Sequence, residues 1–517
     1  MGRTKKRVNP RRGRVAGATP GGKPELVPGG AAPPVAFDAA RVAEQMRLYW
    51  RSGSGSAFVV GSESGRWAIW PEQAVIDEMR CLPDRIIAIK AREDERVSEV
   101  KRVFLHVRKE RVLDEVFNAL PGYRAGIHEL PQGERVLVKS APRLVEPVEG
   151  DFPTIKALIE GRLDLTPDGG KDQTPWFWSW CKIADDALRN GEPGHWRQGH
   201  ALILAGPAGC GKNRIQENVI TPLLGGREAD PTKMLFDGDE FNGDAFAAEH
   251  LLLSEVPTPS QRTVDRTLLA ERIKRTVAQS LQRMRLMRVE PWTVFPFWRL
   301  TISVNDDPDK LRSLPTITPD FEDKVLIFHC RHVPLPMPTT TIAEQRAFRE
   351  RLKAQMPAFV WWLQNEWEVP EDLKTYQDGR DATRFGFREF HSPVVRGGLY
   401  EETPGAELLA LIDQARFATI GEFAEDGERV DLWDVPSWKS GRVWNERALT
   451  LQQLLCGQWP GWRSTVEDLA KAFFRHNNAA RVLARLAEDE KHRRGRVTRC
   501  DERNMRGWLI RPPGNAA

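Results

Sequence analysis

The sequence feature that most constrains the fold is a glycine-rich segment, GPAGCGKN, at residues 206–213. The preceding residues 200–205 (HALILA) form a short apolar run, which is typical of a buried parallel strand. Residues 214–224 then place apolar side chains at helical spacing. A strand, a glycine-rich turn and a helix in this order predict a phosphate-binding loop. The predicted loop consists of Gly206, Pro207, Ala208, Gly209, Cys210, Gly211, Lys212 and Asn213.

The residue types of this loop suit a nucleoside triphosphate and Mg²⁺. Glycines let consecutive backbone N–H groups surround a phosphate at the positive end of a helix. Lys212 adds a mobile charge for the β- and γ-phosphates. The next position usually carries Ser or Thr, whose hydroxyl binds Mg²⁺, and here it is Asn213, whose amide oxygen is a suitable acceptor. We therefore expect ATP and Mg²⁺ as cofactors.

A second apolar run, HLLLSEVP at 250–257, contains Glu255 at its polar end. An acid there can activate the attacking water and contribute to a Mg²⁺ site together with Asn213. The usual pattern has two acids at such a strand end, and Ser254 replaces the first of them. An ordinary glutamate at a strand end is the alternative interpretation.

A third apolar run, WRLTISVND at 298–306, ends in Asn305. Open α/β sheets form their sites from side chains at the C-terminal ends of several strands. We therefore expect Asn305 to lie near Lys212 and Glu255, where it would orient the attacking water or sense the γ-phosphate.

Between these two runs, residues 266–291 form an amphipathic basic stretch. A solvated helix face is the ordinary explanation of such a charge pattern. Because the stretch lies between two predicted site strands, we also consider it a DNA-binding segment. Its candidate nucleic-acid contacts are Lys274, Arg283, Arg285 and Arg288.

Composition places the chain among soluble globular proteins: 40% of its 517 residues are hydrophobic and 29% are charged. It has no apolar stretch of membrane-spanning length, no secretory leader and no closely spaced cysteine pair, so we expect a cytoplasmic protein without a membrane partner. The net charge of +4 is small, but residues 1–15 carry seven basic groups and no acid. This terminal segment is a candidate phosphate contact, or alternatively a solubilising tail.

Changes in composition predict the domain organisation. Short alternating runs at 57–60 and 66–70, a helical pattern at 73–82 and a run at 134–140 predict a small module of strands and helices. Three tryptophans within residues 176–180 favour buried helix packing over base stacking. The predicted units are a disordered basic tail (1–35), an α+β module (36–146), a helical lead-in (147–195), an α/β core (196–335), a mostly helical region (336–445) and a C-terminal module (446–517).

The C-terminal module resembles a winged helix-turn-helix. Two helical patterns are separated by HNN at 476–478, and two short apolar runs at 495–500 and 506–511 would form the wing. Arg481 and Arg485 lie one turn apart on the second predicted helix, which enters the major groove in such domains. Small winged domains also bind proteins, and that alternative stays open.

The order of GPAGCGKN, LLLSEV, the basic stretch at 274–288 and TISVND resembles superfamily 3 helicases, in particular the helicase part of phage and mobile-element (poxvirus-type) primase-helicases. The similarity extends upstream to residues 122–153. It implies a P-loop NTPase (AAA+-like) core within an α/β fold, flanked by the N-terminal α+β module and the C-terminal winged-helix domain. It also implies a homo-hexameric ring around single-stranded or forked DNA, with ATP bound between subunits.

The family usually supplies an arginine finger to the neighbouring subunit. In this sequence Lys324 stands in that region, with Arg312 and Arg331 as rivals. A primase half is absent from the motifs, so a separate primase or replication protein is a further expected partner. The sequence thus predicts an ATP-dependent DNA helicase or translocase of a phage or mobile element, in the cytoplasm of a bacterial host. Two alternatives stay open: a DNA-binding initiator or regulator that binds nucleotide without hydrolysis, and a P-loop ATPase that remodels protein.

Overall fold

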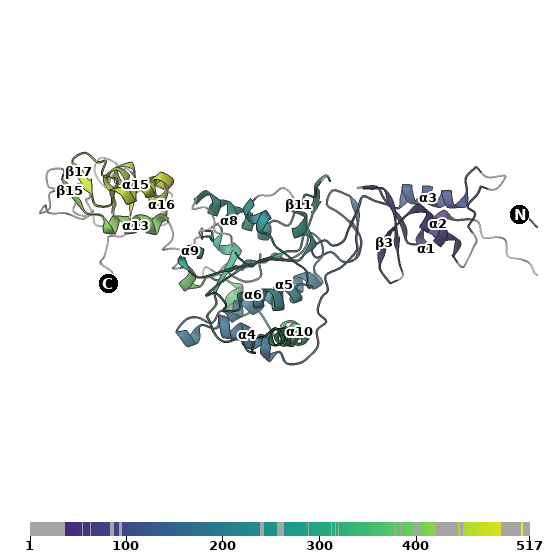
Figure 1. Ribbon diagram of the computed structural model, residues 1–517, viewed down its shortest axis with the longest axis horizontal. Helices are drawn as coiled ribbons and strands as arrows, with labels where there is room; N and C mark the ends of the chain where they lie inside the picture. Colours follow the sequence, from purple (N-terminus) through teal and green to yellow (C-terminus); the bar gives the residue numbers. More distant parts are fainter. Residues whose placement is uncertain are drawn as a thin grey trace, which may run out of the picture.

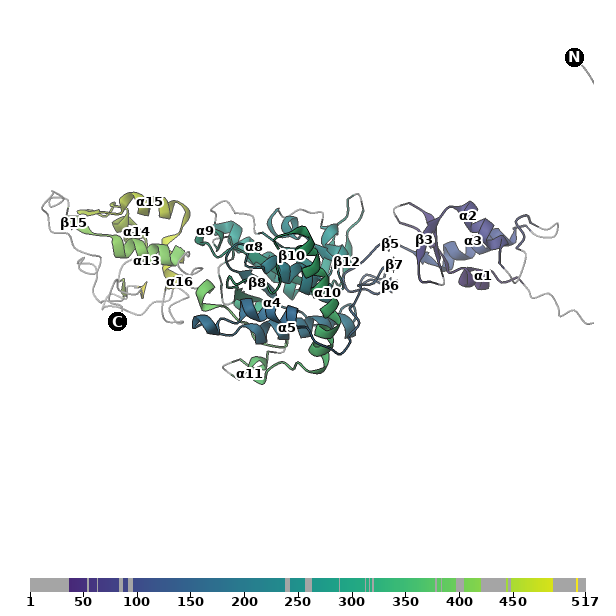
Figure 2. The ribbon, with the colours of Figure 1, turned by 60° about the horizontal axis from the view of Figure 1, so that its bottom comes forward.

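The computed structural model shows an elongated chain in which N-terminal, central and C-terminal groups of elements follow one another (Figures 1 and 2). No stretch of the basic tail predicted at 1–35 lies among the described residues. The structure describes residues 37–419, 443–444, 448–486 and 508–509, without 54, 63, 83–86, 92–95, 238–241, 256–262, 288, 312, 316, 319, 377–378, 383 and 397–403.

The N-terminal elements form a four-stranded sheet in the order β3-β2-β1-β4, with helices packed on one face. The strands and the helix predicted between residues 57 and 82 are confirmed. Val103, Val107 and Phe58 are buried between the helices and the sheet. The elements are α1 (Ala39–Gln45), β1 (Leu48–Arg51), β2 (Ala57–Gly61), β3 (Trp67–Trp70), α2 (Glu72–Arg80), α3 (Glu99–Glu110) and β4 (Val112–Leu113).

A three-stranded sheet, β5-β7-β6, follows and includes the strand predicted at 134–140. Phe117, Leu120 and Val136 belong to the apolar cluster under the central sheet, not to the N-terminal cluster. This sheet thus packs with the central body, while Leu137 also packs with Val59 and Leu113 of the N-terminal sheet. The strands are β5 (Glu115–Phe117), β6 (Gly126–Glu129) and β7 (Arg135–Val138).

The central body contains a five-stranded parallel sheet in the order β14-β8-β13-β10-β9. All five residues of β8 and all six of β13 are buried, since both faces of the sheet are covered. The strands predicted within the apolar runs at 200–205, 250–257 and 298–306 are thus confirmed. The strands are β8 (Ala201–Ala205), β9 (Glu228–Ala229), β10 (His250–Leu253), β13 (Arg299–Val304) and β14 (Val325–His329).

Helices α4, α5 and α10 cover one face of this sheet (Figure 1). Trp176, Trp178 and Trp180 of α5 are at most 4% exposed, which confirms their predicted role in helix packing. Trp180 Nε1 donates to the backbone oxygen of His200 at 3.0 Å and ties the helix to β8. The elements on this side are α4 (Pro153–Leu163), η1 (Thr166–Asp168), α5 (Thr174–Asn190), α10 (Ile342–Asn365) and α11 (Glu371–Lys374).

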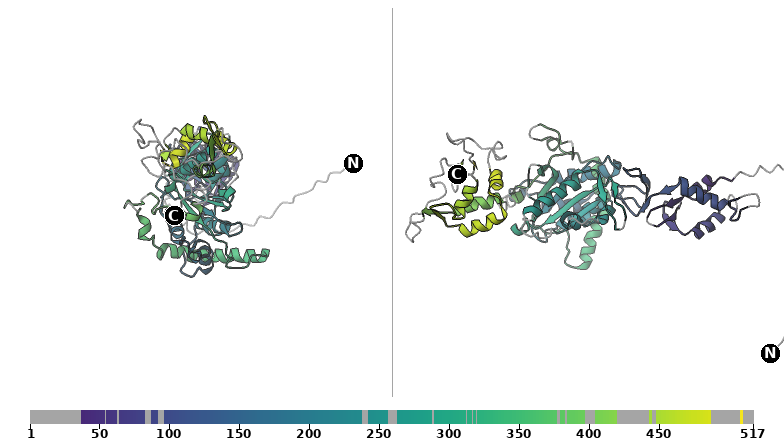
Figure 3. Two further views of the ribbon diagram at one scale, coloured as in Figure 1. Left: turned by 90° about the vertical axis from the view of Figure 1, so that its left-hand side faces the viewer. Right: turned by 90° about the horizontal axis from the view of Figure 1, so that it is seen from above.

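The opposite face is covered by α8 and by the antiparallel hairpin of β11 and β12 (Figure 1; Figure 3 gives two further views of the ribbon). The basic stretch at 266–291 is therefore a helix followed by a hairpin, because α8 ends at Ala278. The elements here are η3 (Lys233–Asp237), η4 (Gly243–Ala247), α8 (Thr263–Ala278), β11 (Gln282–Met284), β12 (Trp292–Val294), α9 (Pro308–Leu311) and η5 (Glu322–Lys324).

The C-terminal elements bury their own apolar cluster between four helices. The two predicted helices are present, with residues 477–478 between them. The first predicted wing strand, at 495–500, lies outside the described residues, and β18 pairs with β16 instead. The winged-helix interpretation stays a prediction. The elements are α13 (Pro404–Gln414), β15 (Phe417–Thr419), β16 (Val443–Trp444), α14 (Ala448–Leu455), β17 (Trp462–Ser464), α15 (Glu467–His476), α16 (Ala479–Leu486) and β18 (Trp508–Leu509).

In the part of the chain that the structure describes, every helix is too short or too polar to cross a lipid bilayer.

Candidate functional site

The glycine-rich segment connects the buried strand β8 to a helical run that starts at Lys212. This run consists of α6 (Lys212–Ile215), a π-helical turn η2 (Gln216–Ile220) and α7 (Thr221–Leu223), so the predicted helix is confirmed. Gly209 and Gly211 have φ values of 76° and 103°, a region that favours glycine. A Cβ atom on Gly206 would lie 2.3 Å from the backbone oxygen of Cys330. The tight turn therefore depends on glycine at these positions.

The side chain of Lys212 folds back over the loop. Its Nζ donates to the backbone oxygens of Gly206 at 2.6 Å and Pro207 at 2.8 Å, and to Asn305 Oδ1 at 3.3 Å. Lys212 is 6% exposed and forms no ion pair with a described carboxylate. The structure thus brings two predicted site residues, Lys212 and Asn305, into contact. The Lys212 ammonium group is buried among neutral acceptors, and a bound anion can take the place of those acceptors.

The ends of the two strands beside β8 supply further polar groups that the sequence reasoning missed. Asp306 follows Asn305, and its backbone N–H donates to the Gly206 oxygen at 3.3 Å. His329 ends β14, and its Nε2 lies 3.2 Å from Asp306 Oδ2. The D in TISVND was the available signal for Asp306, whereas the sequence gives no signal for its pairing with His329.

Arg162 of α4 packs against the loop, and the sequence reasoning did not predict it as a site residue. It is 1% exposed, and its Nε donates to the backbone oxygen of Cys210 at 2.7 Å. A Cβ atom on Gly211 would approach Arg162 Nε to 2.8 Å. Burial lowers the pKa of Arg162, but a guanidinium keeps its charge at neutral pH. The arginine therefore fixes the shape of the loop and adds positive charge beneath it.

Two thiols meet at the same place. The hydrogen bond from Cys330 and the nearby charge of Lys212 lower the pKa of Cys210 to about 6, although burial opposes them. The same hydrogen bond and complete burial raise the pKa of Cys330 well above its ordinary value. Lys212 Nζ lies 3.7 Å from Cys210 Sγ. The loop cysteine thus contributes to the polar environment of the lysine.

Glu255 and Asn213 are less closely tied to the loop. Glu255 is exposed beyond the end of β10, which β13 separates from β8, and it makes no hydrogen bond with another described residue. Asn213 is exposed in the first turn of the helix. Both lie on the C-terminal side of the sheet or at the start of the helix, as predicted, but the structure shows no interaction that joins them.

Lys324 lies before the N-terminal end of β14, at the end of the sheet opposite the loop. It precedes Val325, whose register partner is Ala201 at the start of β8, whereas the loop begins at the end of β8. Its Nζ pairs with Asp323, and its side chain is 13% exposed. Of its rivals, Arg312 lies outside the described residues, and Arg331 pairs with Asp168 at 3.2 Å. The structure therefore does not bring Lys324 to the loop of its own chain.

A basic groove of about 820 Å³ runs along α8 and β11. Two predicted contacts line it, but Lys274 is already paired with Asp320 at 2.6 Å and with Glu271 at 2.5 Å. Arg283 is exposed on β11. Among the residues that the structure describes, the cations that line the groove are Arg272, Lys274, Arg275, Arg283 and Arg384, and the lining acid is Glu271.

The remaining residues predicted to contact nucleic acid are not among those that line the groove. Arg285 follows β11, and Arg288 lies outside the described residues. Arg481 and Arg485 fall within α16, but their side chains are not among those described. The sequence reasoning did not single out Arg275 and Arg384. Arg384 enters the groove because it donates to Gln198 Oε1 and to the Ala278 oxygen at the end of α8.

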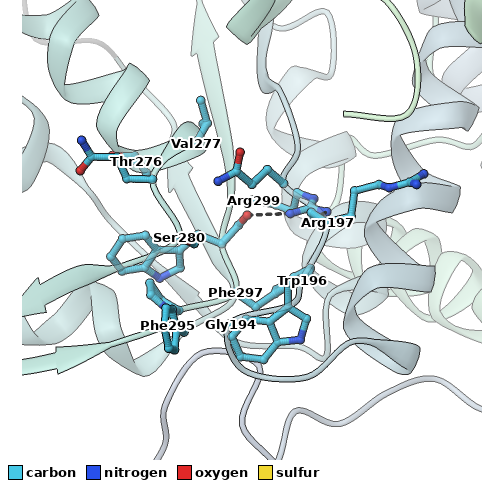
Figure 4. A pocket seen from close by; sticks show the side chains of 13 residues that line it. Gly194, Trp196, Arg197, Thr276, Val277, Ser280, Phe295, Phe297 and Arg299 are labelled. Atoms are coloured by element: carbon cyan, nitrogen blue, oxygen red, sulfur yellow. Dashed lines mark hydrogen bonds between the residues drawn. The ribbon is translucent and has the colours of Figure 1, made fainter. Parts of the chain in front are cut away.

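A smaller pocket lies near the N-terminal end of β13 (Figure 4). Arg299 is 2% exposed there and donates to the backbone oxygen of Arg197 at 3.0 Å, while its guanidinium lies 4.6 Å from the Phe297 ring centre. Complete burial lowers the pKa of Arg299 to about 9. The volume of about 30 Å³ has room for water molecules only, so this pocket is not a nucleotide site.

No protein-family model matches the chain, and no curated protein matches its sequence. Among solved structures it is similar to apo forms of the NrS-1 C-terminal region. An A-form structure has 13% identity and a TM-score of 0.45, covering 72% of this chain and 77% of that one. A second apo structure, of residues 305–718, has 13% identity and a TM-score of 0.46 over 73% and 78%. At these scores the similarity carries no conclusion about function.

Proposed function

We propose that the chain is an ATP-dependent DNA helicase or translocase with a P-loop NTPase (AAA+-like) core, acting in the replication of a phage or mobile element. One observation carries the proposal. The buried Lys212 lies in a glycine turn between a parallel strand and a helix, and the side chain of Asn305 contacts it at 3.3 Å. A lysine and an amide at the C-terminal edge of such a sheet suit the phosphates of a nucleotide.

The order of the strands supports this interpretation. β13, which leads to Asn305, lies between β8, which leads to the loop, and β10, which leads to Glu255. A lysine, an amide and a carboxylate therefore follow three adjacent parallel strands. ATP would be held by the backbone N–H groups of the loop and by Lys212, while Asn213 and Glu255 would face its Mg²⁺. A bound Mg²⁺ would neutralise phosphate charge as the γ-phosphate is transferred to water.

The protein groups would divide the remaining work. Lys212 would leave the carbonyl oxygens that now hold it and bind phosphate oxygens. Glu255 would accept the proton of the attacking water, and Asn305 would orient that water. A finger residue such as Lys324 would act on the site of a neighbouring copy in a homo-hexamer, after breaking its pair with Asp323.

The groove along α8 and β11 supports nucleic acid as the track. Among the described residues, five cations line it against one acid, and the phosphate backbone dominates the affinity of proteins for nucleic acid. Arg275 and Arg283 are both exposed and can contact a strand of nucleic acid. Cytoplasmic location, single-stranded or forked DNA and a separate primase remain parts of this proposal.

A second candidate is a DNA-binding initiator or regulator that is switched by nucleotide without hydrolysing it. The observation that favours it is the exposed Glu255, which makes no hydrogen bond with the described loop residues, next to Ser254 where an acid is usual. A P-loop ATPase that remodels protein is the third candidate, and stimulation by DNA separates it from the helicase.

The test is ATP hydrolysis by the full chain with and without single-stranded DNA. We expect turnover that rises with DNA and is lost in Lys212→Ala and Glu255→Gln, and Asn305→Ala should slow it strongly. Tight ATP binding without turnover under any condition would replace the helicase by the switch. Turnover that DNA does not change would favour the protein-remodelling ATPase.

A further inference from the structure

The proposed Mg²⁺ site has fewer charged ligands than its function calls for. Asn213 and Ser254 are neutral, and Glu255 is exposed on the far side of β13. Mg²⁺ binds oxygen atoms, keeps several waters and usually takes one or two carboxylates together with phosphate oxygens. A carboxylate supplied from another strand end would make up the deficit.

Asp306 is a carboxylate whose own backbone is hydrogen-bonded to the loop, at 3.3 Å from its N–H to the Gly206 oxygen. The preceding residue, Asn305, contacts Lys212. The Asp306 side chain is 29% exposed, so solvent and ligands reach it. Its Oδ2 contacts His329, and its Oδ1 has no hydrogen-bond partner among the described residues. One carboxylate oxygen is thus available beside the loop.

The contact between Asp306 and His329 spans the root of the loop. Asp306 follows β13 and His329 ends β14, and these are the two strands on either side of β8. The side chains meet at 3.2 Å where β8 passes into Gly206. The pair therefore lies over the point at which the glycine turn begins.

The backbone of His329 is held in place before any ligand arrives. The buried Gln173 donates to the His329 backbone oxygen at 2.8 Å and accepts from its N–H at 2.9 Å. Gln173 also donates to the Leu163 oxygen at 3.0 Å, which ties it to the end of α4. A ligand residue whose partner is fixed in this way loses less conformational freedom on binding.

We propose that Asp306 supplies the carboxylate that faces the Mg²⁺ of a bound nucleoside triphosphate, in place of the acid absent at position 254, and that His329 is its positioning residue. This inference rests on the proposed nucleotide site. It assigns to the end of β13 a part that the sequence pattern places at the end of β10. The rival is a structural role, in which the pair only ties β13 to β14.

The test measures how strongly Mg²⁺ tightens ATP binding by the full chain, using calorimetric titration in EDTA and at rising Mg²⁺ concentration. We expect Asp306→Asn to lose about tenfold or more of the Mg²⁺-dependent gain in affinity. Its affinity for ATP in EDTA should be unchanged or higher, since a negative charge near the phosphates is removed. His329→Phe should lose part of the gain, whereas His329→Gln, whose amide still donates, should lose less.

Asp307→Asn is the matched control, because Asp307 is the next residue and is exposed. It should change the Mg²⁺ effect by less than about twofold, within the small effects expected of surface substitutions. Equal melting temperatures would show that the variants fold alike. If Asp306→Asn keeps the wild-type Mg²⁺ effect, the structural role is correct and the proposal is overturned. If the wild-type chain binds ATP equally with and without Mg²⁺, the proposal also fails while the nucleotide site stands. If the wild-type chain binds no ATP at all, the proposed function itself fails.

Discussion

Replacing Arg162 by methionine should destabilise the central body while leaving the apolar volume of α4 nearly unchanged. The guanidinium is buried without a described carboxylate partner and donates to backbone oxygens only. These are Cys210 at 2.7 Å, Leu158 and Val333 at 3.1 Å, and Pro334 at 3.4 Å. Methionine fills the space but donates no hydrogen bond, so the Cys210, Val333 and Pro334 oxygens lose this partner, whereas the Leu158 oxygen keeps its helical hydrogen bond within α4.

The magnitude follows from these contacts. A buried carbonyl left without a donor costs about 1–2 kcal/mol, and the three oxygens outside α4 together cost about 3–6 kcal/mol. Removing a buried cation returns part of this loss, because its desolvation penalty is relieved. The net loss should therefore be about 2 kcal/mol. For a body of this size, 1 kcal/mol lowers the melting temperature by about 2–4 °C, so we expect a decrease of about 4–8 °C.

Scanning calorimetry of the full chain measures this directly. Arg331→Met is the matched control, because Arg331 lies beside the same helix but is 23% exposed and donates to a single backbone oxygen, that of Gly161, besides its pair with Asp168. Its loss should be below about 1 kcal/mol, as for other exposed ion pairs. The reasoning is refuted if Arg162→Met melts within 2 °C of the wild type, or if both variants lose the same amount.

Three further outcomes are expected. Gly206→Ala should abolish nucleotide binding, measured by calorimetric titration, because its Cβ would lie 2.3 Å from the Cys330 oxygen; retained affinity would contradict the tight turn. Burial lowers the pKa of His200 to about 3. The unfolded chain therefore binds a proton at this residue near pH 6.5 that the folded chain does not bind, and the stability of the fold decreases as the pH falls. Between pH 7 and 5, the free energy of unfolding of His200→Leu, measured in urea, should fall by about 2 kcal/mol less than that of the wild type. At pH 7 the variant should be as stable as the wild type, because both ring nitrogens of His200 lack partners among the described residues. An unchanged pH dependence would contradict this. Arg283→Ala should reduce the salt dependence of DNA binding by about one phosphate contact. Lys274→Ala should change it less, because two carboxylates already neutralise Lys274. The reverse order would exclude the groove as the DNA-binding surface.

The sequence by itself determined the elements around the loop. Residues 201–205 and 299–304 are continuous apolar runs, and such runs become strands that are buried on both faces, wherever the rest of the chain lies. Glycine at 209 and 211 predicts a turn with positive φ for the same local reason. The rule that parallel strands deliver their polar ends to one edge was sufficient to bring Asn305 to Lys212.

The tertiary structure decided which charged groups serve the site. In sequence, Arg162 and Arg331 are alike, but only the first is enclosed by backbone oxygens from distant segments. Lys274 is as basic in sequence as Arg283, but Asp320 approaches it from 46 residues away and neutralises it. Hydrophobic periodicity is a local property that neighbouring residues fix. The partner of a charge depends on which segments the completed sheet and its helices bring within about 3 Å. The pairing of Asp306 with His329 across the end of β8 therefore becomes visible only once the strands are in order.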